Sequence, residues 1–163
     1  MSATFSLDIQ AVLALPETGA LLLLAIGNTL RGDDSAGPYI AQNLAGQLKH
    51  IQLIDCGEKP ENYLDEITAL KPGKVIILDA ADFGGIPGEL RAIPKEAIPQ
   101  NTISTHLFPL STLAALIEED TKAKVYFFGL QVQNVSLGSV MSQEVLSTAD
   151  SLISYLKEQD SHA

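Results

Sequence analysis

The chain has 163 residues, of which 46 % are hydrophobic and 18 % charged, a composition typical of a globular domain rather than a disordered chain. Ten basic and twenty acidic residues give a formal net charge of −10, which argues against a nucleic-acid or anionic-membrane partner. The single cysteine rules out an internal disulfide and any metal site built from several cysteines. We therefore expect one domain over residues 1–163.

Two features of the sequence bear on location. No apolar run reaches 18 residues, so we expect no membrane insertion. The first ten residues, MSATFSLDIQ, have no basic region before an apolar stretch, which predicts a cytoplasmic protein without a secretory signal. The pentapeptide LPETG at 15–19 matches a cell-wall sorting signal, but such signals lie near a C-terminus, and we interpret the match as coincidence.

Strand-like apolar runs recur along the chain. The predicted strands are 20–26 (ALLLLAI), 51–55 (IQLID), 74–79 (KVIILD), 88–93 (GELRAI) and 124–130 (KVYFFGL). Three of them are apolar throughout, as expected for strands buried on both faces of a parallel sheet. The segment 88–93 alternates only weakly, and we expect it at an edge.

Amphipathic helical patterns lie between these strands. Pro38, Pro60 and Pro109 are each expected to open a helix, because proline suits the first helical position. The inward faces are Ile40, Ala41, Leu44, Ala45 and Leu48; Tyr63, Leu64, Ile67 and Leu70; and Leu110, Leu113, Ala114 and Ile117. A fourth helix carries Val145, Leu146, Ala149, Leu152, Ile153 and Leu156, with Ser142 as its expected cap.

This alternation of strands and helices predicts an α/β fold: a three-layer α/β/α sandwich around a twisted, mostly parallel five-stranded sheet. Residues 1–18 form either an extra element or a loose N-terminal arm.

Polar residues are expected to gather at the carboxyl ends of the strands, where open α/β sheets bind ligands. They are Asn28, Arg31, Asp33 and Asp34 after the first strand, Asp79 and Asp82 at the third, His106 before the third helix, and Gln131 after the last strand. Taken singly, paired aspartates can cap a helix, an aspartate can anchor a loop, and a histidine can be a surface residue, as we read His50 and His162. Together, two carboxylates and an imidazole at one edge favour a metal site.

The stretch GNTLRGDDSAGP at 27–38 is glycine-rich but does not match a phosphate-binding motif. Its two aspartates would repel a phosphate unless a cation lay between them, so it favours a cation site. Its glycines are expected to permit a tight turn with positive φ. Neither Cys56 nor Ser35 nor Ser104 has a recognisable base, so a serine or cysteine hydrolase lacks its signature.

Three motifs, GNTLRGDDSAGP, ILDAADFGGIPGEL and STHLFPL, resemble those of the hydrogenase maturation endopeptidases, as do DCGEKPEN and FFGLQ. The resemblance covers roughly residues 20–155. It implies a twisted sheet with helices on both faces. It also implies an endopeptidase that removes the C-terminal extension of a nickel–iron hydrogenase large-subunit precursor after nickel insertion.

The same resemblance implies that Asp34, Asp79 and His106 are the metal-binding and catalytic residues. Asp34 is preferred to Asp33 because the second acidic position of the first motif is the ligand in the family. The nickel would be carried by the substrate, and no organic cofactor is implied. Ser35 stands where many members have glycine, and it would be strained if that position required positive φ.

Two other functions stay open on the residues alone. A divalent-metal phosphohydrolase would hold magnesium with Asp33, Asp34 and Asp79, but Arg31 is the one cation of the motif. A nickel-sensing assembly chaperone would bind the precursor without cutting it. The sequence does not identify the group that attacks the peptide bond.

Overall fold

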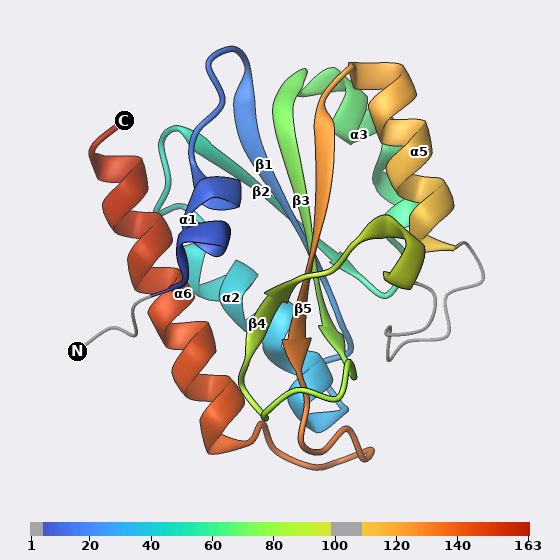
Figure 1. Ribbon diagram of the computed structural model, residues 1–163, viewed down its shortest axis with the longest axis vertical. Helices are drawn as coiled ribbons and strands as arrows, with labels where there is room; N and C mark the ends of the chain where they lie inside the picture. The colour runs from blue at the N-terminus through green and yellow to red at the C-terminus, as the bar shows by residue number, and fades with distance from the viewer. Residues whose placement is uncertain (1–4, 99–108) are drawn as a thin grey trace.

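The computed structural model describes residues 5–98 and 109–163 (Figure 1). Its centre is one five-stranded sheet with strand order β2-β1-β3-β5-β4. The strands are β1 (Ala20–Ile26), β2 (Ile51–Gly57), β3 (Pro72–Ala81), β4 (Leu90–Ala92) and β5 (Lys124–Gln131). The first three and β5 are parallel, whereas β4 pairs antiparallel with β5 at the edge. The predicted mostly parallel sheet and its edge strand are confirmed.

The sheet is buried on both faces because its central strands carry apolar side chains at successive positions. Leu22 and Leu24 enter one core cluster, and Leu21 and Leu23 enter the other. Successive side chains of a strand point to opposite faces, so a run of leucines supplies both cores at once.

Helices cover the two faces, and Figure 1 shows α5 on one side of the sheet and α6 on the other. The helices are α1 (Leu7–Leu13), α2 (Ala36–Leu44), α3 (Leu64–Ala69), α5 (Leu110–Thr121) and α6 (Gln143–Ser161). Short 3-10 turns are η1 (Gly32–Ser35), η2 (Pro60–Tyr63) and η3 (Lys95–Ala97). Residues of α3 and α5 enter one core cluster, and those of α1, α2 and α6 enter the other. This is the predicted three-layer sandwich.

The helix starts differ from the sequence prediction. Pro38 is the third residue of α2, Pro60 opens the turn η2 rather than α3, and Pro109 is the residue before α5. Each position lies in or just before a first turn, where the missing N–H of proline leaves no bond unmade. Helix α2 also ends earlier than its apolar pattern suggests, so Ala45 is exposed just beyond it.

Residues 5–18 form an extra element rather than a loose arm. Helix α1 buries Ile9 and Leu13 against the sheet. The Lys74 ammonium donates hydrogen bonds to the carbonyl oxygens of Val12 and Ala14, at 3.0 and 2.7 Å, at the end of this helix. In the part of the chain that the structure describes, no helix has the length and apolar character needed to cross a membrane.

Candidate functional site

The carboxyl ends of β1, β2, β3 and β5 meet at one edge of the sheet, at the lower end of the view in Figure 1. Asp34 lies in the turn η1 after β1, and Asp79 lies near the end of β3. The turn η1 packs against β3. The structure therefore brings the two predicted carboxylates to the same edge, at 2 % and 1 % exposure.

The backbone folds tightly around Asp34. The Asn28 N–H donates to the Asp34 carbonyl oxygen at 3.1 Å and lies 3.2 Å from its carboxylate Oδ2. The Asn28 side-chain amide also donates to Glu58, which follows β2, at 3.2 Å. A side chain at Gly27 would place its Cβ only 2.0 Å from the Asp34 carbonyl oxygen. Glycine at 27 is thus required for the close approach that positions Asp34.

Gly32 adopts a φ of +53°, as expected for a tight turn, and a Cβ there would lie 2.3 Å from the Ser139 hydroxyl. Ser35, in contrast, has a φ of −81° and donates from its hydroxyl to the Gly32 carbonyl oxygen at 2.6 Å. The strain considered for Ser35 is therefore absent, because its backbone lies in the ordinary helical region.

Asp33 has a different role from its neighbour. Its Oδ2 accepts from the backbone N–H groups of Gln133 and Asn134 at 2.7 and 2.9 Å. Its Oδ1 accepts from the Ser142 N–H at 2.6 Å, and the Ser142 hydroxyl donates to Oδ2 at 3.0 Å. Ser142 does immediately precede α6, but its side chain makes no capping bond. Both oxygens of Asp33 hold the loop after β5, which supports Asp34 as the ligand of the pair.

Asp79 lies in the buried carboxyl-terminal part of β3. Its Oδ1 accepts from the Ala80 N–H at 2.8 Å, and its strand partner is Gly129 of β5. Burial of a carboxylate disfavours its charged form unless a cation lies nearby, and both Asp34 and Asp79 are buried at this edge. This pair can therefore act as anionic oxygen ligands for a divalent metal.

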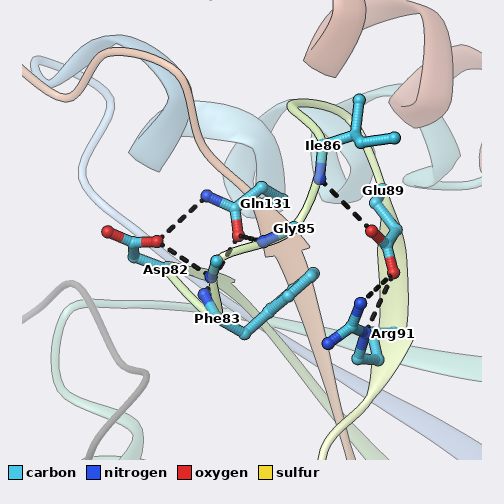
Figure 2. Close-up of polar contacts among 8 residues, drawn as sticks. Asp82, Phe83, Gly85, Ile86, Glu89, Arg91 and Gln131 are labelled. Atoms are coloured by element: carbon cyan, nitrogen blue, oxygen red, sulfur yellow. Dashed lines mark hydrogen bonds and ion pairs between the residues drawn. The ribbon is translucent and has the colours of Figure 1, made fainter.

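Gln131, at the end of β5, organises the loop that follows Asp79 (Figure 2). Its Oε1 accepts from the N–H groups of Phe83 and Gly85, both at 3.0 Å. Its Nε2 donates to the exposed Asp82 carboxylate at 3.2 Å. The sequence predicts Gln131 at this edge but not this role, because Asp82, Phe83 and Gly85 lie some fifty residues earlier.

The third proposed ligand, His106, lies outside the described residues, as does Ser104. Within residues 5–98 and 109–163, no group of three histidine, cysteine or acidic side chains could hold a metal ion. The ligand set of Asp34, Asp79 and His106 therefore stays a prediction, with two of its members placed at one edge.

Cys56 is a poor candidate for a nucleophile. Its side chain is buried in β2 and enters a core cluster. Burial raises the pKa of the Cys56 thiol to about 12, and the neighbouring carboxylates of Asp55, Glu66 and Glu61 act in the same direction. The thiolate is the reactive form of cysteine, so this thiol is inert near neutral pH.

The family follows from comparison with known proteins. A model of the hydrogenase maturation protease family matches residues 38–159. The chain belongs to the hydrogenase maturation protease family. It is 35 % identical over 138 residues to the hydrogenase 3 maturation protease of Escherichia coli (strain K12), covering 83 % of this chain and 88 % of that protein. A putative hydrogenase maturation protease of Methanocaldococcus jannaschii is 29 % identical over 147 residues, or 85 % of this chain and 86 % of that protein.

Solved structures agree with this membership. The crystal structure of a [NiFe] hydrogenase maturation protease from Thermococcus kodakarensis KOD1 matches with a TM-score of 0.80 and 30 % identity, covering 94 % of this chain and 99 % of that one. Because this family consists of proteases, the chain is a peptide hydrolase, as the resemblance of its sequence motifs predicted. The phosphohydrolase and the non-cleaving chaperone are therefore set aside.

Proposed function

We propose that this maturation protease removes the C-terminal extension of a nickel–iron hydrogenase large-subunit precursor once the precursor holds nickel. Asp34, Asp79 and His106 would bind that nickel, which is part of the substrate. The observation that carries the proposal is the pair Asp34 and Asp79, buried at one edge of the sheet while Asp33 is engaged elsewhere. The proposal also includes a cytoplasmic location, as the sequence predicts.

The open ligand set supports a metal shared with the substrate. Two carboxylates and one imidazole leave coordination positions of a first-row divalent ion unfilled. Such a site binds a free ion weakly, but it binds far better when the precursor supplies the remaining ligands, because two partners then hold one metal. Docking of the metal brings the peptide bond beside Asp34 and Asp79.

The test compares nickel-loaded and nickel-free precursor as substrates of the dialysed protein. We expect cleavage of the loaded precursor, seen as the mass loss of a C-terminal peptide, and no cleavage of the other. Asp79→Asn and His106→Ala should abolish the mass loss. His162→Ala is the matched control, because His162 lies at the far end of α6, and this variant should cleave normally.

Elemental analysis of the dialysed protein completes the test. We expect less than one metal ion per ten chains. Stoichiometric zinc, together with equal cleavage of both precursors, would overturn the substrate-nickel proposal and indicate a protease with a resident metal.

A further inference from the structure

Exposed apolar side chains gather around the candidate site. Of the large hydrophobic side chains that the described residues expose, Leu30, Ile86, Leu137 and Val140 lie on loops at the carboxyl edge, and Leu7 lies on α1. We call Leu30, Leu137 and Val140, at 64 %, 66 % and 85 % exposure, the apolar rim. Ile86 lies on the neighbouring β3–β4 loop (Figure 2).

The two loops of the apolar rim are held together by backbone hydrogen bonds. The Gly138 N–H donates to the Leu30 carbonyl oxygen at 2.7 Å, and the Gly32 N–H donates to the Ser139 carbonyl oxygen at 3.1 Å. Leu30 and Leu137 are therefore neighbours although they are over a hundred residues apart in sequence.

Asp33 fixes the same loop near both of its ends, through Gln133 and Asn134 on one side and Ser142 on the other. The loop is thus preorganised. Its hydrogen bonds hold a conformation in which the apolar side chains are exposed to water. Apolar side chains exposed on two loops that are bonded to each other fit a contact site for another protein.

The lack of charge in the loop that carries Leu137 and Val140 also favours a contact site. The segment 132–142, VQNVSLGSVMS, has no charged residue, in a chain with thirty acidic and basic residues. Depletion of charge together with exposed apolar groups is the composition of the centre of a protein–protein interface. This loop therefore suits a protein partner whose contact surface is apolar.

We infer that the apolar rim is the docking surface for the folded part of the hydrogenase precursor, whose own contact surface there is apolar. This inference rests on the proposed function. Leu30 lies four residues before Asp34 in the same loop and turn, and the other rim loop is bonded to Asp33. A precursor that reaches Asp34 therefore also covers the rim. A second copy of this chain on the rim would instead cover Asp34 and block the site.

The experiment measures steady-state cleavage of nickel-loaded precursor by Leu137→Asp/Val140→Asp. We expect kcat/KM to fall at least tenfold through a raised KM, with kcat within twofold, because charges then face an apolar surface. The matched control is Leu7→Asp, which changes a similarly exposed side chain (81 %) on α1 and should keep kcat/KM within twofold of wild type. Leu137→Ser/Val140→Ser, a milder change at solvent-exposed positions, should still lower kcat/KM at least threefold.

Three results would overturn the inference. If both rim variants cleave as wild type does, the rim is no docking surface, although the proposed function stands. If wild type itself cleaves neither precursor, the proposed function fails and the docking inference fails with it. If sedimentation shows a wild-type dimer that Leu137→Asp/Val140→Asp abolishes while cleavage is unchanged, the rim is a contact between copies of this chain.

Discussion

Asp33 and Ser142 are joined by two hydrogen bonds across 109 residues of sequence, one from the Ser142 backbone N–H and one from its hydroxyl. The first loop of the sheet edge is thereby tied to the start of α6. The adjacent residue, Asp34, lies in the same turn but is placed for the candidate site. On the proposed function, Asp33 serves structure and its neighbour Asp34 binds the metal.

This division predicts opposite effects for two matched substitutions. Asp33→Asn removes the charge that three backbone N–H groups and a hydroxyl share, and should lower the free energy of unfolding by about 1–3 kcal/mol. Asp34→Asn should abolish precursor cleavage with a smaller change in stability, because carboxylates gathered at an active site serve function rather than the core. Urea denaturation and the cleavage assay measure the two effects. A fully active Asp34→Asn protein together with an inactive, stable Asp33→Asn protein would transfer the ligand role to Asp33.

The sheet could be predicted from sequence because its strands are continuous apolar runs such as Leu21–Leu24, and these need burial on both faces. The ends of the helices could not, because proline tolerates several first-turn positions, as Pro38 in the third position of α2 illustrates. The sequence left residues 1–18 open between an extra element and a loose arm, because the seven residues of α1 are stabilised mainly by packing of Ile9 and Leu13 on the sheet, a contact that local pattern does not reveal.

The site was predictable only in its outline. The rule that parallel strands share a carboxyl edge correctly placed Asp34 and Asp79 at the same edge of the sheet. The roles of Asp33 and Gln131 depend on partners about 100 and 50 residues away, so no local signal reported them. His106 lies outside the described residues, and its place at the site stays a prediction.

Asp160 predicts a pH dependence of stability. Its carboxylate accepts backbone N–H groups of Lys49, His50 and Ile51, each at 2.7 Å, and so holds the start of β2 to the end of α6. Burial alone would raise the pKa of Asp160, but the three hydrogen bonds and nearby His50 outweigh it and lower the pKa below its ordinary 3.8.

A carboxyl whose pKa is lowered by folding stabilises the protein above its unfolded pKa, and this contribution is lost as the pH falls through the folded pKa. Asp160→Asn should therefore lower the free energy of unfolding by about 1–3 kcal/mol at pH 7. The difference from wild type should shrink below pH 3.8. Urea denaturation from pH 2 to pH 7 measures it, and a difference that is constant with pH would contradict the assigned role.

Lys74 should anchor helix α1. Its ammonium lies at the carboxyl end of that helix, where it binds free carbonyl oxygens and interacts favourably with the helix dipole. Lys74→Met should lower the free energy of unfolding by about 1 kcal/mol. Amide hydrogen exchange should become faster in α1 but not in β1.

The control is Lys124→Met. Lys124 is exposed and, like Lys74, lies over the Tyr126 ring, but it makes no bond to α1 in the part of the chain that the structure describes. We expect this variant to leave exchange in α1 unchanged. Equal effects of the two variants would indicate that loss of positive charge at this end of the sheet, and not the bonds of Lys74, loosens the helix.

Cys56 should be dispensable for peptide cleavage. Its thiol is buried, and a pKa of about 12 leaves almost no thiolate at pH 8. Because it is the sole cysteine of the chain, the mass gained from iodoacetamide reports on it alone. We expect alkylation at pH 8 to be at least a hundredfold slower in the folded protein than in guanidinium chloride. Cys56→Ala should process nickel-loaded precursor within twofold of wild type, whereas a folded Cys56→Ala protein without activity would make Cys56 the attacking group.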